Sequence, residues 1–313
     1  MIYTLTLNPA LDIVLETYLI KKKEINTTAL KSISIGGKGF NTSRALNCLG
    51  LDNIALCFYG GTFKGYAEKI IKEEKLKFKI INIVNETRIN LKIIETKNNK
   101  VVEFNERGPS IRKKEISLLI NFIEKIQEEV YFFIVSGSLP KNISETIYRK
   151  IILILKKKNI KVLLDSSGLP LYHGICARPY FLKINLKELL EINEIKNSKN
   201  FEKTVFEIIA NYHKSGINTV MITDGAKKAY YYNGYDFLIA EPPVVNHLYV
   251  TGSGDTINAA LVYSFINNFN AEKTFRFSMA CGISNLYSSI PGKINLMNVR
   301  EVEKKIQIKK WHI

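Results

Sequence analysis

Two glycine-rich segments of this 313-residue chain lead into stretches with helical periodicity and carry residues suited to phosphate chemistry. The later segment reads Thr251-Gly252-Ser253-Gly254-Asp255-Thr256. Its glycines allow a tight turn, so backbone N–H groups can converge at a helix N-terminus, where the helix dipole also favours an anion. Asp255 could accept the proton of an attacking hydroxyl. An aspartate that only caps a helix after a glycine turn would show the same pattern.

The earlier segment, Gly36-Gly37-Lys38-Gly39-Phe40-Asn41, contains a lysine between its glycines. Glycines let a ligand approach the backbone, Lys38 can contact a phosphate, and Asn41 can bind a sugar hydroxyl. Upstream, Asn8-Pro9-Ala10-Leu11-Asp12 places a carboxylate just after the first expected strand, where it could hold a polyol. A plain strand–helix turn and an ordinary turn aspartate remain the alternatives.

The elements that must position these residues alternate between strand and helix patterns. This alternation predicts an α/β fold, a doubly wound and mostly parallel sheet with helices on both faces. Such a sheet binds ligands beyond the carboxyl ends of its strands. The expected strands are Ile2–Leu7, Ile54–Tyr59, Tyr131–Val135, Lys161–Leu164, Phe181–Ile184 and Thr219–Thr223, and the expected helices are Asn41–Leu49, Lys64–Glu74, Lys114–Glu129, Glu145–Lys157, Phe201–Lys214, Asp255–Asn267, Ala271–Ser289 and Val299–Ile306.

Two stretches, at about 12–35 and 88–104, have strand character without helices between their strands. Paired with each other, they would form a small sheet that projects from the main one. We expect this sheet to be a lid over the active site or a dimer surface. The whole chain, 1–313, is expected to be one domain with these strands inserted.

Composition excludes several other classes of function. The net charge of +16 is spread along the chain, so it indicates a compositional bias that suits anionic substrates and not a nucleic-acid-binding patch. The four cysteines lack CxxC spacing, so we expect no zinc site, no disulfide framework and a reducing cytoplasm. The N-terminus alternates like a strand and not like a signal peptide. The longest aliphatic run, Ile151–Leu155, is too short to span a membrane.

Together, the motifs resemble the ribokinase-like carbohydrate kinases of the phosphofructokinase-B family, especially the branch of 1-phosphofructokinases and tagatose-6-phosphate kinases. The matching motifs occur in the family's order over nearly the whole chain. Besides the two glycine segments they include Thr6 to Asp12, Gly60-Gly61, Glu86 to Asn90, Glu106 to Pro109, Ser136 to Pro140, Leu164 to Gly168, and Lys183-Ile184-Asn185 with Glu188.

The resemblance implies a role for each matching position. Asp255 corresponds to the catalytic base, and the amides from Gly252 through Ser253 and Gly254 to Asp255 correspond to the anion hole. Arg88 corresponds to an arginine that holds the substrate phosphate, which suits its bidentate geometry. The other implied substrate-binding residues are Asp12, Gly37, Lys38, Asn41 and Ser138.

The resemblance also implies ATP as phosphate donor and Mg²⁺ as cofactor. Asn185 and Glu188 correspond to the element associated with the metal, and Glu188 is expected to act through water because Mg²⁺ retains much of its hydration shell. The residues implied on the nucleotide side are Lys183, Asn185, Glu188, Thr223, Gly225 and Asn285.

Three departures from the family pattern leave the substrate open. Thr27 stands where many relatives have an arginine, Ile184 separates Lys183 from Asn185, and Asp224 adds a carboxylate near the nucleotide phosphates. The expected activity is ATP-dependent phosphorylation of a ketohexose phosphate, with fructose 1-phosphate converted to fructose 1,6-bisphosphate. The alternatives are a tagatose-6-phosphate kinase and a catalytically impaired sugar-phosphate sensor. Relatives form dimer contacts through the small sheet, so a homodimer is expected.

Overall fold

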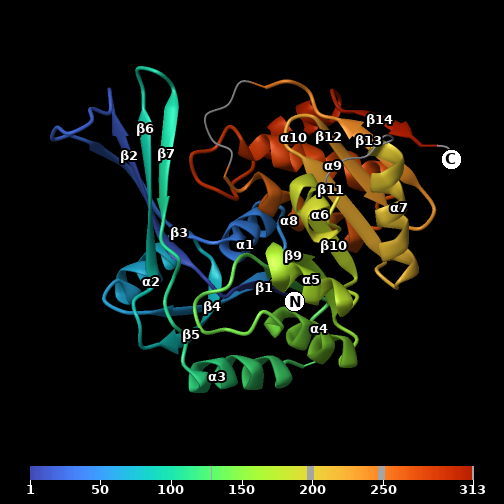
Figure 1. Cartoon of the computed structure of the whole chain (residues 1–313), viewed down its shortest axis with the longest axis horizontal. Coiled ribbons are helices and arrows are strands. Elements are labelled where there is room, and N and C mark those ends of the chain that lie inside the picture. Colours follow the sequence, from blue (N-terminus) through green and yellow to red (C-terminus); the bar gives the residue numbers. More distant parts are fainter. Residues whose placement is uncertain (128, 196–200, 246–250, 312–313) are drawn as a thin grey trace.

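The computed structural model describes residues 1–127, 129–195, 201–245 and 251–311, and its centre is a ten-stranded sheet (Figure 1). The strand order is β14-β13-β12-β11-β10-β9-β8-β1-β4-β5. The strands from β11 to β5 run parallel, and β12, β13 and β14 add an antiparallel edge. Their bounds are β1 Ile2–Thr6, β4 Asn53–Gly60, β5 Lys77–Ile83, β8 Phe132–Ser136, β9 Lys161–Asp165, β10 Phe181–Asn185, β11 Thr219–Asp224, β12 Lys228–Tyr232, β13 Phe237–Glu241 and β14 Gln307–Lys310.

Helices cover both faces of this sheet because its strands are apolar on both sides. In β8, for example, Phe133 and Val135 join one buried cluster while Phe132 and Ile134 join another. The first cluster takes in α3 (Lys113–Glu124), α4 (Ile147–Lys157), α5 (Gly168–Cys176), α6 (Leu186–Ile192) and α7 (Phe201–Lys214); the second takes in α1 (Lys38–Cys48), α8 (Ser253–Ile266), α9 (Ala271–Asn285) and α10 (Leu296–Glu303). This is the doubly wound α/β architecture that the sequence predicts.

A second sheet of four strands projects from the main sheet and appears in blue and cyan in Figure 1. Its order is β3-β2-β6-β7, and β2 pairs with β6 in parallel while the two outer pairs are antiparallel. At its base, α2 (Lys64–Glu73) packs on a third buried cluster. The strand bounds are β2 Ala10–Thr17, β3 Ala29–Gly36, β6 Arg88–Glu95 and β7 Lys100–Asn105.

Several element boundaries differ from the sequence prediction. Helix α1 begins at Lys38, one turn earlier than expected, because the helix starts directly after Gly37, which has φ 121°. Helix α3 ends at Glu124 and does not reach Glu129; residue 128 of the expected helix lies outside the described residues. No helix in the described part of the chain has both the length and the apolar character that a bilayer crossing requires.

Polar residues end three neighbouring strands of the main sheet. Thr6 of β1 is in register with Ser136 of β8, and Ser136 is in register with Asp165 of β9. Because parallel strands end on the same edge of a sheet, these side chains gather at one place. Helix α1 lies directly on this edge: a Cβ added at Gly39 would be only 2.4 Å from Thr6 Oγ1.

Candidate active site

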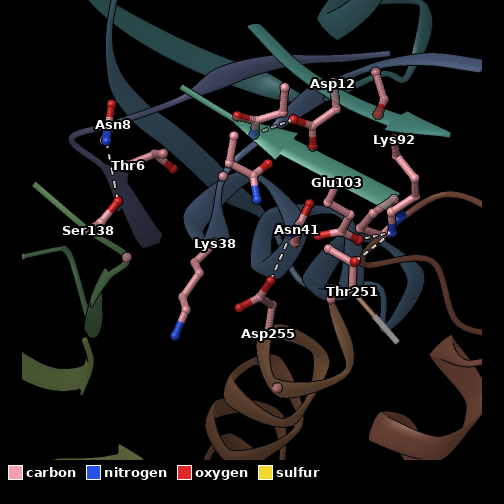
Figure 2. Close-up of a pocket in the computed structure, with 18 of the residues that line it drawn as sticks. Thr6, Asn8, Asp12, Lys38, Asn41, Lys92, Glu103, Ser138, Thr251 and Asp255 are labelled. Atoms are coloured by element: carbon pink, nitrogen blue, oxygen red, sulfur yellow. Dashed lines mark hydrogen bonds and ion pairs between the residues drawn. The ribbon is translucent and has the colours of Figure 1, made fainter. Parts of the chain in front are cut away.

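A cavity of about 510 Å³ lies between the carboxyl edge of the main sheet and the small sheet. Figure 2 shows that Asp12 and Lys92 approach it from the strands of the small sheet, while Asp255 approaches from the opposite side. Its lining includes Asp12, Gly37, Lys38, Asn41, Arg88, Ser138, Glu188 and the segment Thr251, Gly252, Gly254 and Asp255. The structure therefore brings together both glycine segments and all six substrate-binding residues that the sequence indicated.

The later glycine segment forms the N-terminus of α8. Gly252 has φ 93°, a left-handed conformation that favours glycine, and a Cβ there would be 2.8 Å from the backbone nitrogen of Gly292. Ser253 and Gly254 then begin the helix, where backbone N–H groups have no partner inside the helix. Ser253 itself is held through its hydroxyl, which donates to the carbonyl of Gly282 at 2.8 Å. These amides are suited to an anion.

Asp255 lies in the first turn of α8 with only 5% of its surface exposed. Asn41 Nδ2 donates to Asp255 Oδ2 at 2.8 Å (Figure 2). Burial raises the pKa of Asp255 to about 6, although Lys38 acts in the opposite direction. A buried carboxylate with a pKa just below neutrality is suited to accept a proton at physiological pH.

A second buried carboxylate, Asp165, binds two lysines and an asparagine from three other elements. Its Oδ1 accepts from Lys38 Nζ at 2.7 Å, and its Oδ2 accepts from Lys183 Nζ at 3.3 Å and from Asn258 Nδ2 at 2.7 Å. Burial favours the neutral acid, but Lys183 and Lys38 outweigh it and lower the pKa of Asp165 to about 2. The two ion pairs thus fix the positions of both lysine side chains.

Lys183 is directly against the α8 N-terminus. A Cβ added at Gly254 would lie 2.6 Å from Lys183 Nζ, so the glycine makes room for the ammonium. The sequence placed Lys183 near the nucleotide phosphates but gave Asp165 no role. The only sequence signals for it are its place at the end of an expected strand and within the matching motif from Leu164 to Gly168, and neither indicates what the carboxylate does.

Among the residues expected to bind the substrate, Asp12 is fixed within the small sheet. Its Oδ1 accepts from Asn90 Nδ2 at 2.8 Å, and burial raises the pKa of Asp12. A Cβ added at Gly36 would be 2.0 Å from Asp12 Oδ2, so this glycine is needed to accommodate the carboxylate. The other amide atom of Asn90, Oδ1, is buried and has no partner. It is a candidate group for a ligand hydroxyl.

Arg88 lies in the cavity wall, but its guanidinium is already bound to the backbone. It donates to the carbonyls of Asn8 at 3.0 Å, Glu106 at 2.9 Å and Pro9 at 3.4 Å. A guanidinium has five N–H donors, so two remain for a phosphate. Ser138 accepts from Asn8 Nδ2 at 3.3 Å, which ties the same corner to the segment after β8.

Asn185 and Glu188 form a capping box at the start of α6. Asn185 Oδ1 accepts from the Glu188 N–H at 2.8 Å, and Glu188 Oε2 accepts from the Asn185 N–H at 2.9 Å. Glu188 also lines the cavity, and burial raises its pKa. Each side chain therefore retains acceptor capacity that could face a hydrated cation.

Five of the six residues expected on the nucleotide side lie outside the cavity lining, namely Lys183, Asn185, Thr223, Gly225 and Asn285. Thr223 is the second-last residue of β11, just before the turn at Gly225, which has φ 53°. Asn285 is fully buried; its Nδ2 donates to the carbonyl of Thr251 at 2.9 Å and its Oδ1 accepts from the Gly292 N–H at 2.7 Å. Asn285 thus braces the glycine segment of α8.

The three departures from the family pattern lie outside the lining of this cavity. Thr27 is exposed, away from the cavity lining, and Ile184 is fully buried in the core of the main sheet. Asp224 lies 4.0 Å from Lys227, which offsets part of its charge.

Comparison with known proteins gives the class to which this geometry belongs. The model of the pfkB family of carbohydrate kinases matches residues 5–287, so the chain belongs to this family. It is a sugar kinase, a phosphotransferase with an alcohol group as acceptor. It is 30% identical over 305 residues to the 1-phosphofructokinase of Borreliella burgdorferi, covering 97% of this chain and 96% of the relative.

Solved structures show the same fold. Phosphofructokinase-2 from Escherichia coli, in complex with potassium, superimposes with a TM-score of 0.90 at 22% identity, covering 97% of this chain and 98% of the other. A structure from Thermotoga maritima described as a possible 1-phosphofructokinase gives a TM-score of 0.87 at 20% identity and covers both chains in full.

Proposed function

We propose that this kinase transfers the γ-phosphoryl group of ATP to a ketohexose phosphate, converting fructose 1-phosphate to fructose 1,6-bisphosphate. The observation that carries the reaction type is the position of Asp255: a buried carboxylate, with its pKa raised to about 6, at the glycine-lined start of α8. The likeness to a 1-phosphofructokinase over almost the whole chain supports the choice of sugar.

In this mechanism Asp255 accepts the proton of the attacking sugar hydroxyl. The N–H groups of Ser253 and Gly254 stabilise the negative charge of the phosphoryl group in transit, and the nearby ammonium of Lys183 adds to this field. Lys38 contacts the substrate phosphates from the other side. Because Asp165 fixes both ammonium groups in advance, little reorganisation is needed during the reaction.

Asp12, Asn41, Arg88 and Ser138, with the backbone at Gly37, hold the sugar phosphate. The two N–H groups of Arg88 that are not bound to carbonyls are available to bind the substrate phosphate. Three backbone bonds fix the plane of its guanidinium, so the orientation of these two donors is set before the substrate arrives.

ATP is the donor that the family implies, and we propose Mg²⁺ as its counterion. The described residues contain no group of three His, Cys, Asp or Glu side chains that could hold a metal ion by themselves. Mg²⁺ is commonly held in protein sites through one or two side chains, the ATP phosphates and water. Glu188 and Asn185 would hold its water shell, and the ion would neutralise phosphate charge. Lys183, Thr223, Gly225 and Asn285 complete the proposed nucleotide side.

A coupled assay of ADP release against a panel of hexose phosphates tests this function. Turnover with fructose 1-phosphate at the highest kcat/KM is expected. A preference for tagatose 6-phosphate would replace the proposed sugar but keep the reaction. If no phosphosugar supports turnover, a sugar-phosphate sensor would explain the site better.

We also propose that the small sheet serves as lid and dimer surface of a cytoplasmic homodimer. Strands β6 and β7 turn Asn90, Lys92, Glu103 and Asn105 toward the cavity. The alternate positions carry apolar side chains: Val102 and Phe104 are 37% and 58% exposed, although large and hydrophobic. Phe104→Asp should shift the molecular mass measured by light scattering from dimer to monomer. A wild-type monomer would contradict the proposal.

A further inference from the structure

Arg44 lies one turn after Asn41 in α1 and is almost completely buried, with 3% of its side chain exposed. A buried guanidinium is costly unless its charge is paired and its N–H groups are satisfied. Such a group is conspicuous in a helix that the proposed mechanism uses only for Lys38 and Asn41.

Every N–H of Arg44 has an acceptor. Nε donates to Glu74 Oε2 at 2.6 Å and Nη2 donates to Glu74 Oε1 at 3.2 Å, a bidentate ion pair. Nη2 also donates to the carbonyl of Ile35 at 2.7 Å. Nη1 donates to Asn41 Oδ1 at 3.0 Å and to the carbonyl of Pro291 at 3.3 Å. The five bonds use all five donors of the guanidinium.

The bond to Asn41 determines which way the Asn41 amide faces. With Oδ1 bound to Arg44, Nδ2 is directed at Asp255 Oδ2, 2.8 Å away. In the reversed orientation the NH₂ group of Asn41 would meet the N–H groups of Arg44, and two donors would face each other. Arg44 therefore excludes the reversed amide.

We propose that Arg44 is a positioning residue for the proposed base. It fixes the orientation of the Asn41 amide, so that toward Asp255 the Asn41 side chain can act as a hydrogen-bond donor but not as an acceptor. The proposal rests on the role of Asp255 given above. Glu74, at the end of α2, anchors Arg44 in turn. The resulting chain Glu74–Arg44–Asn41–Asp255 runs from the helix beneath the small sheet to the reacting centre.

This fixed orientation has an electrostatic consequence. A donor directed at Asp255 favours its charged form, and the Asn41 bond acts to lower the pKa of Asp255 against the larger effect of burial. If Arg44 is removed, the amide can turn when Asp255 is protonated and accept the new O–H. That stabilises the protonated form, so the pKa rises. The charged groups that face Asp255 from the neighbouring elements are Lys38 on α1, Asp165 on β9 and Lys183 on β10, and none of them changes in this variant.

Arg44 also binds two segments that border the substrates. Ile35 lies at the end of β3, just before the first glycine segment, and Pro291 precedes Gly292, whose N–H is bound by Asn285. A Cβ added at Gly292 would be 2.1 Å from the carbonyl of Asn41, so this turn packs directly on the same residue. Contacts with Glu74, Ile35 and Pro291 thus hold the Arg44 guanidinium in place from three sides.

The test is the pH dependence of kcat at saturating substrates for wild type, Arg44→Met and Arg44→Lys. Arg44→Lys retains the charge opposite Glu74 and protects the fold, but a single ammonium cannot reproduce the fork of five donors. In both variants the acidic limb of the kcat–pH profile should move to higher pH by about one unit. As a result, kcat at pH 6 should fall about fivefold more than kcat at pH 8.5. The substrates are the same in all variants, so their own ionisation cannot cause the difference.

Arg276→Met is the matched control. Arg276 also pairs with a glutamate, Glu272 at 2.7 Å, and donates to backbone carbonyls, but it lies outside the cavity lining. The acidic limb of the kcat–pH profile of Arg276→Met should stay at the wild-type pH even if the melting temperature of this variant falls. Limbs that stay in place in both Arg44 variants would reduce Arg44 to a structural ion pair and overturn the proposal.

The Asn41→Ala background tests whether Arg44 acts on Asp255 through the Asn41 amide or by another route. In this background, adding Arg44→Met should not shift the acidic limb of the kcat–pH profile beyond that of Asn41→Ala alone, because the amide that transmits the effect is gone. An additional shift would show that Arg44 acts by another route. Failure of the proposed function looks different: the wild type would then turn over no phosphosugar, or, if only the role of Asp255 is wrong, Asp255→Asn would turn over normally whatever the Arg44 variants do.

Discussion

Asp255→Asn should inactivate the kinase and stabilise its fold at the same time. The carboxylate is buried, and its pKa is raised to about 6 from the ordinary 3.8. A folded-state pKa above the unfolded one means that the folded protein binds the proton more tightly, so this group stabilises the fold only while protonated and loses that contribution as pH rises through 6. Ionised Asp255 therefore costs about 3 kcal/mol at pH 8 and about half of that at pH 5.

Asparagine has no charge at either pH and keeps an oxygen for the bond from Asn41. The stability advantage of Asp255→Asn over wild type should therefore grow by about 1.5 kcal/mol from pH 5 to pH 8, or about 2 °C in melting temperature for a chain of this size. Meanwhile kcat should fall by roughly 10²-fold or more, the scale of a lost general base. Thermal melts at both pH values and the ADP-release assay measure the two effects.

Two results would refute this reasoning. A stability difference that is equal at pH 5 and pH 8 would show that Asp255 ionises with an ordinary pKa. Near-normal turnover by the folded variant would remove Asp255 from the chemistry.

Three further outcomes are expected. Arg88→Ala should raise KM for the sugar phosphate by about 10- to 150-fold and leave KM for ATP nearly unchanged; the reverse pattern would mean that the two halves of the site are wrongly assigned. Gly254→Ala should displace the Lys183 ammonium, 2.6 Å from the new Cβ, and lower kcat/KM for ATP at an unchanged melting temperature, whereas Gly65→Ala, whose Cβ would meet nothing within 4 Å, should leave turnover unchanged. Amide hydrogen exchange in the small sheet should slow when sugar phosphate is added and slow less with ATP alone; equal protection in both would make the sheet a fixed wall.

Most of the architecture could be predicted from the sequence because its signals are local. The strands at the centre of the main sheet are short apolar runs, and the amphipathic helix Phe201–Lys214 appears with the predicted bounds. The edge of the sheet gave weaker signals. Strand β14, Gln307–Lys310, is mostly polar and exposed, and its identity depends on pairing with β13. Helix α5 contains Pro170 and glycines, which obscure its periodicity.

The site divides in the same way. Lys38, Asn41 and Asp255 stand in glycine segments that the sequence displays openly. Asp165 does not, because its importance comes from two lysines that the fold brings to it from other elements. Arg88 shows the converse limit: its type and motif suggest a free phosphate ligand, but only the structure reveals that three backbone carbonyls already share its guanidinium.

The order of the site residues along the chain has a consequence for protein synthesis. Asp12, Lys38, Asn41 and Arg88 are all synthesised within the first third of translation, but Asp255 follows only after about four-fifths of the chain. Strand β1 also cannot complete its pairing until β8, its neighbour at the centre of the sheet, has been synthesised. A nascent or prematurely terminated chain therefore lacks both the proposed base and the proposed anion hole, so we expect that unfinished molecules do not consume ATP.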